Sequence, residues 1–484
     1  MTSGANTLVL PIVLPLLGAF LLPLVARFGD GLARALGIML VVVNIGLGWL
    51  LWSGAGTEVA VTALGGFEAP LGIVLYGDRL AALFVMVLAV GALIFWPKAE
   101  NGGVKAYTLT LLLVAGGSGL VLSGDLFNIF VFYEIVAVAS YGLTASAGNK
   151  DGFGAALRYL VLGSLGSSLV LIGIALIYAA AGTLNLADIA RLAEDKLTGT
   201  TGLAAFLFLV LGFGVKAELF PVNTWVPEVY AAAPMRVTAI LAGVVSKLAM
   251  VVILRLLVLV FHDPASIQLL MAVALVTIVA GEFAAYRASD LNRTFAYSSI
   301  AQLGLVALAL TIPGTAGILA AIGIALHHAV VKPAFFVIAE KWRGPIAGLA
   351  GGAKVAPAAA GVFVLLSLSI IGIPPLPGFW AKLVLIGGAI DAGGAYAFAA
   401  AVVLAATVVE AAYLFRVVAK IWQPAAGASP ARFAFEDLSP AMLLGVILIA
   451  ATLFMAPIGT ALSGAAASAA DAGSYVARVL PGRM

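Results

Sequence analysis

Apolar runs long enough to cross a lipid bilayer follow one another along almost all of the 484 residues, and this restricts the fold more than any other feature. A membrane-spanning helix needs roughly 20 mostly apolar residues, and by that criterion the chain holds about 14 candidate spans. They begin near Leu8, Gly31, Leu80, Ala106, Leu126, Arg158, Gly202, Val237, Gln268, Thr294, Thr315, Pro357, Gly394 and Ala441. Because backbone polar groups in lipid must be satisfied within the protein, the sequence predicts an all-α, polytopic membrane protein.

The composition agrees with a chain surrounded by lipid. Hydrophobic residues make up 63% of the sequence and charged residues only 10%. A soluble protein of this length needs more polar surface to cover its core. The net charge of +3, without any basic run, argues against a nucleic-acid partner. We read residues 1–20 as the first spanning helix, because they lack the basic start and cleavage site of a signal peptide.

The supply of ligands for metals and redox groups is small. Cysteine is absent, which excludes disulfides, thiolate metal sites and iron–sulfur clusters in this chain. The three histidines are His262, His327 and His328, a poor supply for haem. We therefore predict no metal, no cofactor, and no redox or hydrolytic chemistry in this polypeptide.

The positions of lysine and arginine test the number of spans independently. Loops after odd-numbered spans carry fifteen of these residues, and loops after even-numbered spans carry three. Basic residues collect in cytoplasmic loops. The asymmetry predicts a multi-pass protein of the cell inner membrane, with both termini on the outer side.

Ionisable side chains inside the predicted spans are the main functional signal. The basic ones are Lys216, Lys247, Arg255, Lys332 and Lys382, and the acidic ones are Glu134, Glu218, Glu282, Glu340 and Glu410. A charge at the centre of a spanning helix costs roughly 2.5 to 3.5 kcal/mol on insertion scales, so such groups must face one another or water.

Two interpretations of these charges stay open for part of the set. Charged side chains near span ends can extend to the membrane surface. For Arg255, Glu282, Glu340 and Glu410, this interpretation and a buried functional role are equally compatible with the sequence. For Glu134, Lys216, Lys247 and Lys382 we favour function, because buried amines and carboxylates joined by water can relay protons.

Two spans contain proline-rich interruptions beside a lysine. The segment FGVKAELFPVNTWVPE places Lys216 five residues before Pro221, and IGIPPLPGFWAKL places Pro374, Pro375 and Pro377 before Lys382. Proline opens a helix, and open backbone in a membrane is tolerated where protein or a water-filled cavity shields it. Paired breaks are typical of inverted-repeat transporters, although ordinary kinks remain an alternative. Lys216 and Lys382 lie 166 residues apart. Adding this offset to Lys247 gives position 413, in the span that holds Glu410.

Five motifs in order resemble the antiporter-like subunit superfamily of respiratory complex I, membrane-bound hydrogenases and Mrp-type cation/proton antiporters. They are GDLFNIFVFYEIVAVASYGL, KAELFPVNTWVPEVYAAAP, LNRTFAYSSIAQLG, HHAVVKPAFF and IPPLPGFWAKL. The resemblance covers nearly the whole chain. It implies 14 helices in one membrane domain, two inverted five-helix repeats, and broken helices 7 and 12. The divisions are 1–105 for the N-terminal helices, 106–260 and 267–420 for the repeats, and 438–484 for the C-terminal helix and tail.

The resemblance also implies a proton path. Glu134 matches the family's fifth-helix glutamate and Lys216 its seventh-helix partner. Lys247 matches the eighth-helix lysine, and Lys382 the twelfth-helix lysine that ends the relay. The pair His328 and Lys332 matches the eleventh-helix residues that bridge the halves. Glu218 has no familiar counterpart and is either an additional partner or an interfacial charge.

The leading interpretation is a proton-translocating subunit of a larger complex, with the D subunit of an Mrp-type Na⁺(cation)/H⁺ antiporter as first choice. The DLFNIFVFYE segment resembles that branch, and Asn223 and Arg236 depart from the common pattern. The expected partners are the lipid bilayer and other membrane subunits, including related antiporter-like ones. Protons are the expected cargo. Sodium transport stays open, because no dense cluster of oxygen ligands lies within a span.

Alternatives remain in two directions. A complex I-type or hydrogenase module would use the same relay as the translocase subunit of a redox-driven complex. A stand-alone secondary solute transporter needs a roomy polar pocket, for which the chain offers few uncharged polar clusters. A structural membrane anchor would account for the apolar bulk but not for buried charges at matching places in two halves.

Overall fold

The computed structural model describes residues 7–56, 58–99, 102–425 and 430–482, and these are predominantly helical. Within the described residues, twelve helices are long and apolar enough to cross a membrane, and two shorter apolar helices are Arg79–Ile94 and Pro357–Ile371. Each predicted span corresponds to one of these segments. The predicted all-α fold with many apolar spans is therefore confirmed.

The elements of the first part of the chain are α2 (Leu10–Val25), η1 (Ala26–Phe28), α3 (Asp30–Gly54), β1 (Ala60–Ala63), β2 (Val74–Gly77), α4 (Arg79–Ile94), α5 (Gly103–Leu122), α6 (Leu126–Ala145), α7 (Lys150–Ala181), α8 (Leu186–Lys196), α9 (Gly199–Lys216), α10 (Val226–Ala232), α11 (Met235–Ile240), η2 (Leu241–Val245) and α12 (Ser246–Leu259).

The elements of the remainder are α13 (Pro264–Arg287), α14 (Leu291–Thr311), α15 (Gly314–Lys341), η3 (Ile346–Leu349), α16 (Gly352–Val355), α17 (Pro357–Ile371), α18 (Pro377–Ala392), α19 (Ala395–Trp422), α20 (Phe435–Leu453), α21 (Met455–Ala470) and α22 (Ala472–Val479).

Short polar side chains mark the starts of several long helices. Asp125 accepts a hydrogen bond from the backbone N–H of Asn128 at 3.0 Å at the start of α6, and Asn149 accepts one from Gly152 at 2.7 Å at the start of α7. Asp290 caps α14 in the same way. The first backbone N–H groups of a helix have no partner within it, so these caps fix where each helix begins.

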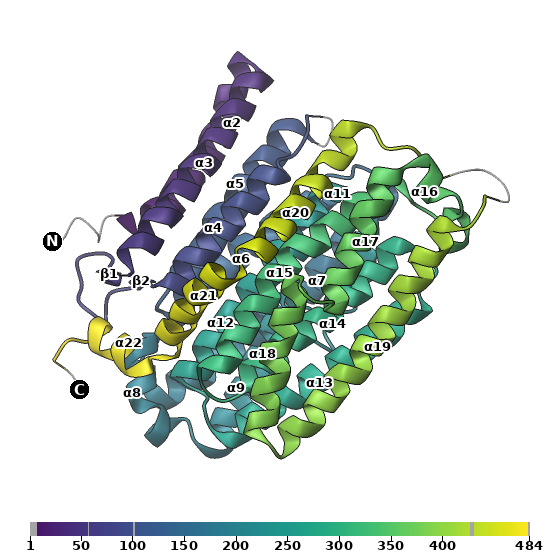
Figure 1. Ribbon diagram of the computed structural model, residues 1–484. Helices are drawn as coiled ribbons and strands as arrows, with labels where there is room; N and C mark the ends of the chain where they lie inside the picture. The colour runs from purple at the N-terminus through teal and green to yellow at the C-terminus, as the bar shows by residue number, and fades with distance from the viewer. Residues whose placement is uncertain (1–6, 57, 100–101, 426–429, 483–484) are drawn as a thin grey trace. The chain divides into compact units, whose positions relative to one another are not determined.

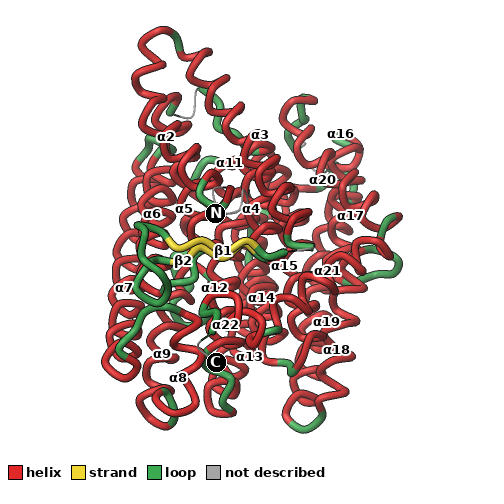
Figure 2. Tube along the Cα trace, turned by 90° about the vertical axis from the view of Figure 1, so that its left-hand side faces the viewer, coloured by secondary structure: helices red, strands yellow, loops and turns green. Residues whose placement is uncertain are grey.

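The first compact unit comprises residues 1–217, 244–270 and 464–484. In it α7 packs against α9, and α5 packs against α2 and α6. The ribbon of Figure 1 shows α2 and α3 running side by side, and they expose large apolar side chains such as Phe20, Leu32 and Trp49. Exposed apolar surface of this extent is expected where helices face lipid. Strands β1 and β2 form an antiparallel pair in which Val61 lies opposite Tyr76 (Figure 2).

The second compact unit comprises residues 218–243 and 271–463. Its centre is α15, which packs against α14, α17, α18 and α20. Helices α18 and α19 also pack against each other. Helix α14 is mostly buried, so polar residues such as Ser298 and Gln302 face other helices, whereas Arg293 near its start is exposed.

The chain leaves helical conformation at both proline-rich segments. Helix α9 ends at Lys216 and the next helix begins at Val226, with Glu218 at φ 60° between them. Helix α17 ends at Ile371 and α18 begins at Pro377. Proline fits the first turn of a helix because its missing N–H would have had no partner there. The inverted repeats, and the assignment of each interrupted pair to one span, stay predictions.

Candidate functional site

Lys216 is the last residue of α9, and its side chain is buried in the first unit. The ammonium nitrogen lies 5.1 Å from the ring centroid of Tyr133, 5.2 Å from that of Tyr141 and 5.1 Å from that of Tyr159. Such distances over ring faces are cation–π contacts. Among the described residues, Lys216 forms no ion pair and its ammonium has no hydrogen-bond partner.

Glu134 is the predicted partner of Lys216 and lies on α6 of the same unit. The two charges are close enough to interact electrostatically. The Glu134 carboxylate accepts a hydrogen bond from the Ser167 hydroxyl of α7. The predicted pair therefore lies in the same unit, but Glu134 is hydrogen-bonded to Ser167, and Lys216 contacts the tyrosine rings.

The helix α12 carries two buried cations. Lys247 is fully buried, and its ammonium donates to the Ser246 hydroxyl at 3.1 Å. Arg255 donates to Asp78 at 2.6 Å, and neither side chain is more than 8% exposed. Of the two interpretations of Arg255, burial within the protein is therefore correct.

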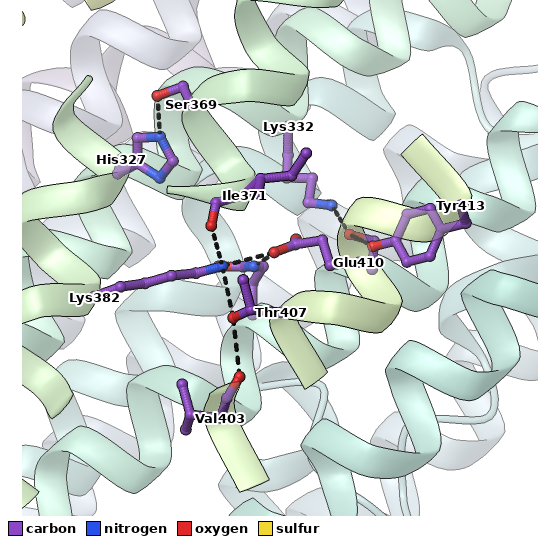
Figure 3. A network of polar contacts seen from close by, with 11 residues as sticks. His327, Lys332, Ser369, Ile371, Lys382, Val403, Thr407, Glu410 and Tyr413 are labelled. Atoms are coloured by element: carbon purple, nitrogen blue, oxygen red, sulfur yellow. Dashed lines mark hydrogen bonds and ion pairs between the residues drawn. The ribbon is translucent and has the colours of Figure 1, made fainter. Parts of the chain in front are cut away.

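In the second unit, Lys382 forms a close ion pair with Glu410 (Figure 3). The Lys382 Nζ lies 2.7 Å from Glu410 Oε2, and it also donates to the carbonyl of Ile371 at 3.3 Å and to the Thr407 hydroxyl at 3.4 Å. Glu410 is 1% exposed. A buried charge is costly unless its partners satisfy it, and these three contacts supply that condition for Lys382.

A second lysine reaches the same region from α15. The Lys332 ammonium donates to Ser298 Oγ at 2.5 Å, and the Tyr413 hydroxyl donates to the same oxygen at 2.8 Å. Gln302, one turn along α14 from Ser298, donates to Glu410 at 2.8 Å. Side chains from α14, α15, α18 and α19 therefore make one polar cluster, which includes Lys332, Ser298, Gln302, Tyr413, Glu410 and Lys382. Figure 3 labels Lys332, Tyr413, Glu410 and Lys382 of this cluster.

Two further carboxylates lie near this cluster. Glu282 on α13 is 3% exposed and interacts electrostatically with Glu410, Lys382 and Lys332. Glu218 is fully buried and accepts a hydrogen bond from the Tyr230 hydroxyl at 2.6 Å. The interpretations of Glu282 and Glu410 as surface-reaching charges and of Glu218 as an interfacial charge are wrong, because all three are enclosed by protein.

Both adjacent histidines of α15 are buried, in different surroundings. His327 Nε2 lies 2.8 Å from the Ser369 hydroxyl. Figure 3 marks this contact with a dashed line. His328 is completely buried, one helical turn before Lys332. Positions i and i+4 of a helix share a face, so the predicted His328–Lys332 pair occupies one side of α15.

Sequence reasoning left the roles of Glu410 and Glu282 open, and it gave no role to Ser298, Gln302, Tyr413, Thr407 and His327. A signal existed for some of them. The 166-residue offset pointed at position 413 beside Glu410, and the motif LNRTFAYSSIAQLG contains both Ser298 and Gln302. No sequence feature indicated which way α13 turns Glu282.

Two curated relatives are similar to most of this chain. The N subunit of the NADH-quinone oxidoreductase of Desulforudis audaxviator is 34% identical, with 80% of this chain and 83% of that protein covered. The D subunit of the Na(+)/H(+) antiporter of Alkalihalophilus pseudofirmus is 33% identical, with 79% of this chain and 80% of that protein covered.

Two solved membrane complexes contain chains of the same fold. A chain of the archaeal membrane-bound sulfane sulfur reductase superposes with a TM-score of 0.90 at 33% identity, covering 98% of this chain and 100% of that one. A chain of the Mrp complex from a Dietzia species gives a TM-score of 0.90 at 26% identity, covering 99% and 100%. Both similarities extend over whole chains, so this protein has the fold of a subunit of multisubunit membrane complexes.

A family model described as "NADH:quinone oxidoreductase/Mrp antiporter, TM" matches residues 123–408. That range contains α6 to α18 and every residue predicted to carry protons. The chain is a multi-pass membrane protein that belongs to the NADH:quinone oxidoreductase/Mrp antiporter transmembrane family.

Proposed function

We propose that this chain is a proton-translocating subunit of a multisubunit membrane complex, and in the first instance the D-type subunit of an Mrp cation/proton antiporter. The observation that carries the proposal is the enclosed cluster of Lys332, Ser298, Tyr413, Glu410 and Lys382. Ionisable groups enclosed within membrane-spanning helices are costly, and they commonly mark proton relays or ion pathways.

The chemistry of the cluster suits proton transfer. The ammonium of Lys382 can give a proton to Glu410, because the two groups already share a hydrogen bond of 2.7 Å. The Ser298 hydroxyl accepts from Lys332 and from Tyr413, so this oxygen connects two groups that gain and lose protons. Each transfer changes the charge beside the next group and thereby favours the following transfer.

The first unit would supply the entry to this path. Glu134 and Lys216 both belong to that unit and interact electrostatically, and Lys247 is buried on α12. In the proposed order, protons enter near Glu134 and Lys216, pass Lys247 and the His328–Lys332 region, and leave by way of Lys382. Lys216 and Lys382 each adjoin an interrupted helix, where open backbone can admit water.

Relatives of both kinds, antiporter and redox-driven complex, are similar to this chain. The similarity to the D subunit of an antiporter supports the first choice. The proposal covers protons as the cargo and leaves open whether sodium or another cation also crosses this chain. The similarities to the N subunit of an oxidoreductase and to a sulfane sulfur reductase chain favour the second candidate, in which partner chains carry the redox groups.

A transporter for an organic solute fits less well. The second unit has a cavity of about 270 Å³ walled by α15, α18, α20 and α21. Its lining is largely apolar, with side chains such as Leu319, Val330 and Ile447, and His327 at one wall. Solute sites fix their ligands with several converging polar groups, which this lining does not supply.

The complex itself separates the two candidates. Gentle purification through a tag on this chain, followed by mass spectrometry of the intact assembly, would identify its partners. Small hydrophobic subunits, including antiporter-like relatives, support the antiporter. Subunits with flavin, nickel or iron–sulfur clusters support the redox-driven pump. A chain that is purified alone and transports a solute without partners would contradict both.

We further propose residence in the cell inner membrane with both termini outside. Since the chain has no cysteine, a single introduced thiol is a clean reporter. Glu68→Cys should react with an impermeant maleimide added to intact cells, and Lys354→Cys should react only after the membrane is opened. Both side chains are exposed, so the reverse pattern would refute the orientation.

A further inference from the structure

Three tyrosine rings surround the ammonium group of Lys216 at nearly equal distances. Tyr133 and Tyr141 come from α6, and Tyr159 comes from α7. The three centroid distances lie between 5.1 and 5.2 Å. Tyr133 and Tyr159 are fully buried, and Tyr141 is 9% exposed. We call these three residues the tyrosine cage.

An aromatic cage is a binding site for an ammonium ion. The face of each ring carries partial negative charge, and its attraction for a cation grows when water is excluded. Here the cation is the side chain of the protein itself. The cage therefore supplies a resting position for the charged form of Lys216 that does not depend on a carboxylate.

Specific contacts hold the rings in place. The Tyr133 hydroxyl donates to the carbonyl of Gly212 at 2.9 Å, one turn before Lys216 on α9. Tyr141 packs edge-on against Tyr159, with centroids 4.8 Å apart. Gly163 leaves the space for Tyr141, because a Cβ atom at that position would overlap the Tyr141 hydroxyl. These contacts hold the rings around the Lys216 ammonium in the structure.

The carboxylate of Glu134 has a separate partner. It accepts from the Ser167 hydroxyl, while Lys216 lies over the rings. The second unit is different, since Lys382 there is in direct contact with Glu410 at 2.7 Å. Among the described residues, Lys216 and Glu134 are therefore a separated pair, and Lys382 and Glu410 are a closed one.

We propose that Tyr133, Tyr141 and Tyr159 are positioning residues that hold the Lys216 ammonium apart from Glu134 and so define the separated state of the first pair. This inference rests on the proposed function, because it assigns the cage a part in proton transfer at Lys216. Movement of the ammonium from the cage to Glu134 closes the pair, and its return opens it. Rings serve this purpose because they stabilise a cation without accepting its proton.

The first test measures proton transport by the purified complex in proteoliposomes. Tyr141→Leu and Tyr159→Leu remove a ring and should lower transport about tenfold each, the scale of one cation–π contact in a water-excluded site. Tyr141→Phe and Tyr159→Phe keep the ring face and should retain most of the transport. In a Lys216→Met background the leucine variants should cause no further loss, because the cage acts through that lysine.

A second pair of variants moves a ring without altering it. Gly163→Ala displaces Tyr141, whereas Gly154→Ala on the same helix meets no atom within 4 Å and is the matched control. Gly163→Ala should reproduce the loss seen with Tyr141→Leu, and Gly154→Ala should transport as the unmodified protein does.

Cryo-electron microscopy of the complex tests the position of the lysine independently of transport. In the Tyr141→Leu/Tyr159→Leu variant, the Lys216 ammonium should lie within ion-pair distance of Glu134. Three results would each overturn the proposed role of the tyrosine cage. The ammonium could keep its position in the double variant, the leucine variants could transport at the full rate, or they could lower transport further in the Lys216→Met background. If Lys216→Met itself transports normally, the proposed function fails, and the position of the ammonium still decides whether the cage exists.

Discussion

The buried lysines Lys382, Lys332 and Lys216 are each held by a different set of partners. Lys382 has a carboxylate, a hydroxyl and a carbonyl, Lys332 has a hydroxyl shared with Tyr413, and Lys216 has three ring faces. A buried cation is tolerated only with such compensation. These differences imply that removing one partner has different consequences at each lysine.

We predict that Glu410→Gln lowers the free energy of unfolding by about 3 to 5 kcal/mol, because it leaves Lys382 charged and without its counterion in the protein interior. Thermal unfolding of the purified complex would measure this. Glu340→Gln is the matched control, since that carboxylate pairs with Arg343 at a half-exposed site and should change stability by at most about 1 kcal/mol.

The double variant Lys382→Met/Glu410→Gln separates stability from transport. It removes both charges and should recover most of the lost stability, while proton transport stays absent. Recovery of transport together with stability would mean that the pair serves packing alone.

At the scale of elements, glycines allow the helices to come close together. A Cβ atom on Gly281 of α13 would lie 2.7 Å from the backbone nitrogen of Ala301 on α14, and one on Gly304 would lie 2.9 Å from the backbone nitrogen of Ile278. Small residues at facing positions let helix backbones approach in membrane proteins. The contact keeps Ser298 and Glu282 on adjoining helices of the second unit.

We predict that Gly281→Ala destabilises the protein by about 1 to 3 kcal/mol, because backbone atoms cannot move aside as a flexible side chain can. Gly361→Ala on α17 is the control, since nothing lies within 4 Å of its added Cβ and alanine favours a helix. Equal unfolding temperatures for the two variants would contradict a close contact between α13 and α14.

The sequence predicts elements better than contacts between them. Hydropathy is a local property, so it located the spans, and the proline-rich segments at Pro221 and Pro375 located where helices stop. The pairing of Lys382 with Glu410 depends on how α18 and α19 are rotated against each other, which no single segment encodes. The same reason explains why the three tyrosines around Lys216 were not assigned.

At the scale of the whole molecule, the polar residues divide between two compact units. Glu134, Lys216 and Lys247 belong to the first, and His328, Lys332 and Lys382 belong to the second. Each unit holds a lysine and a glutamate next to an interrupted helix. A proton path along the chain requires both, so loss of either lysine should stop transport even though the other unit remains intact.

The most direct test is proton transport by the intact complex in proteoliposomes, with Lys216→Met and Lys382→Met introduced separately and subunit content checked in each preparation. We predict that each substitution reduces the rate at least about tenfold, as expected when a group essential for proton transfer is removed. Rates equal to those of the unmodified complex for both variants, with every subunit still present, would contradict the proposal that this chain carries protons.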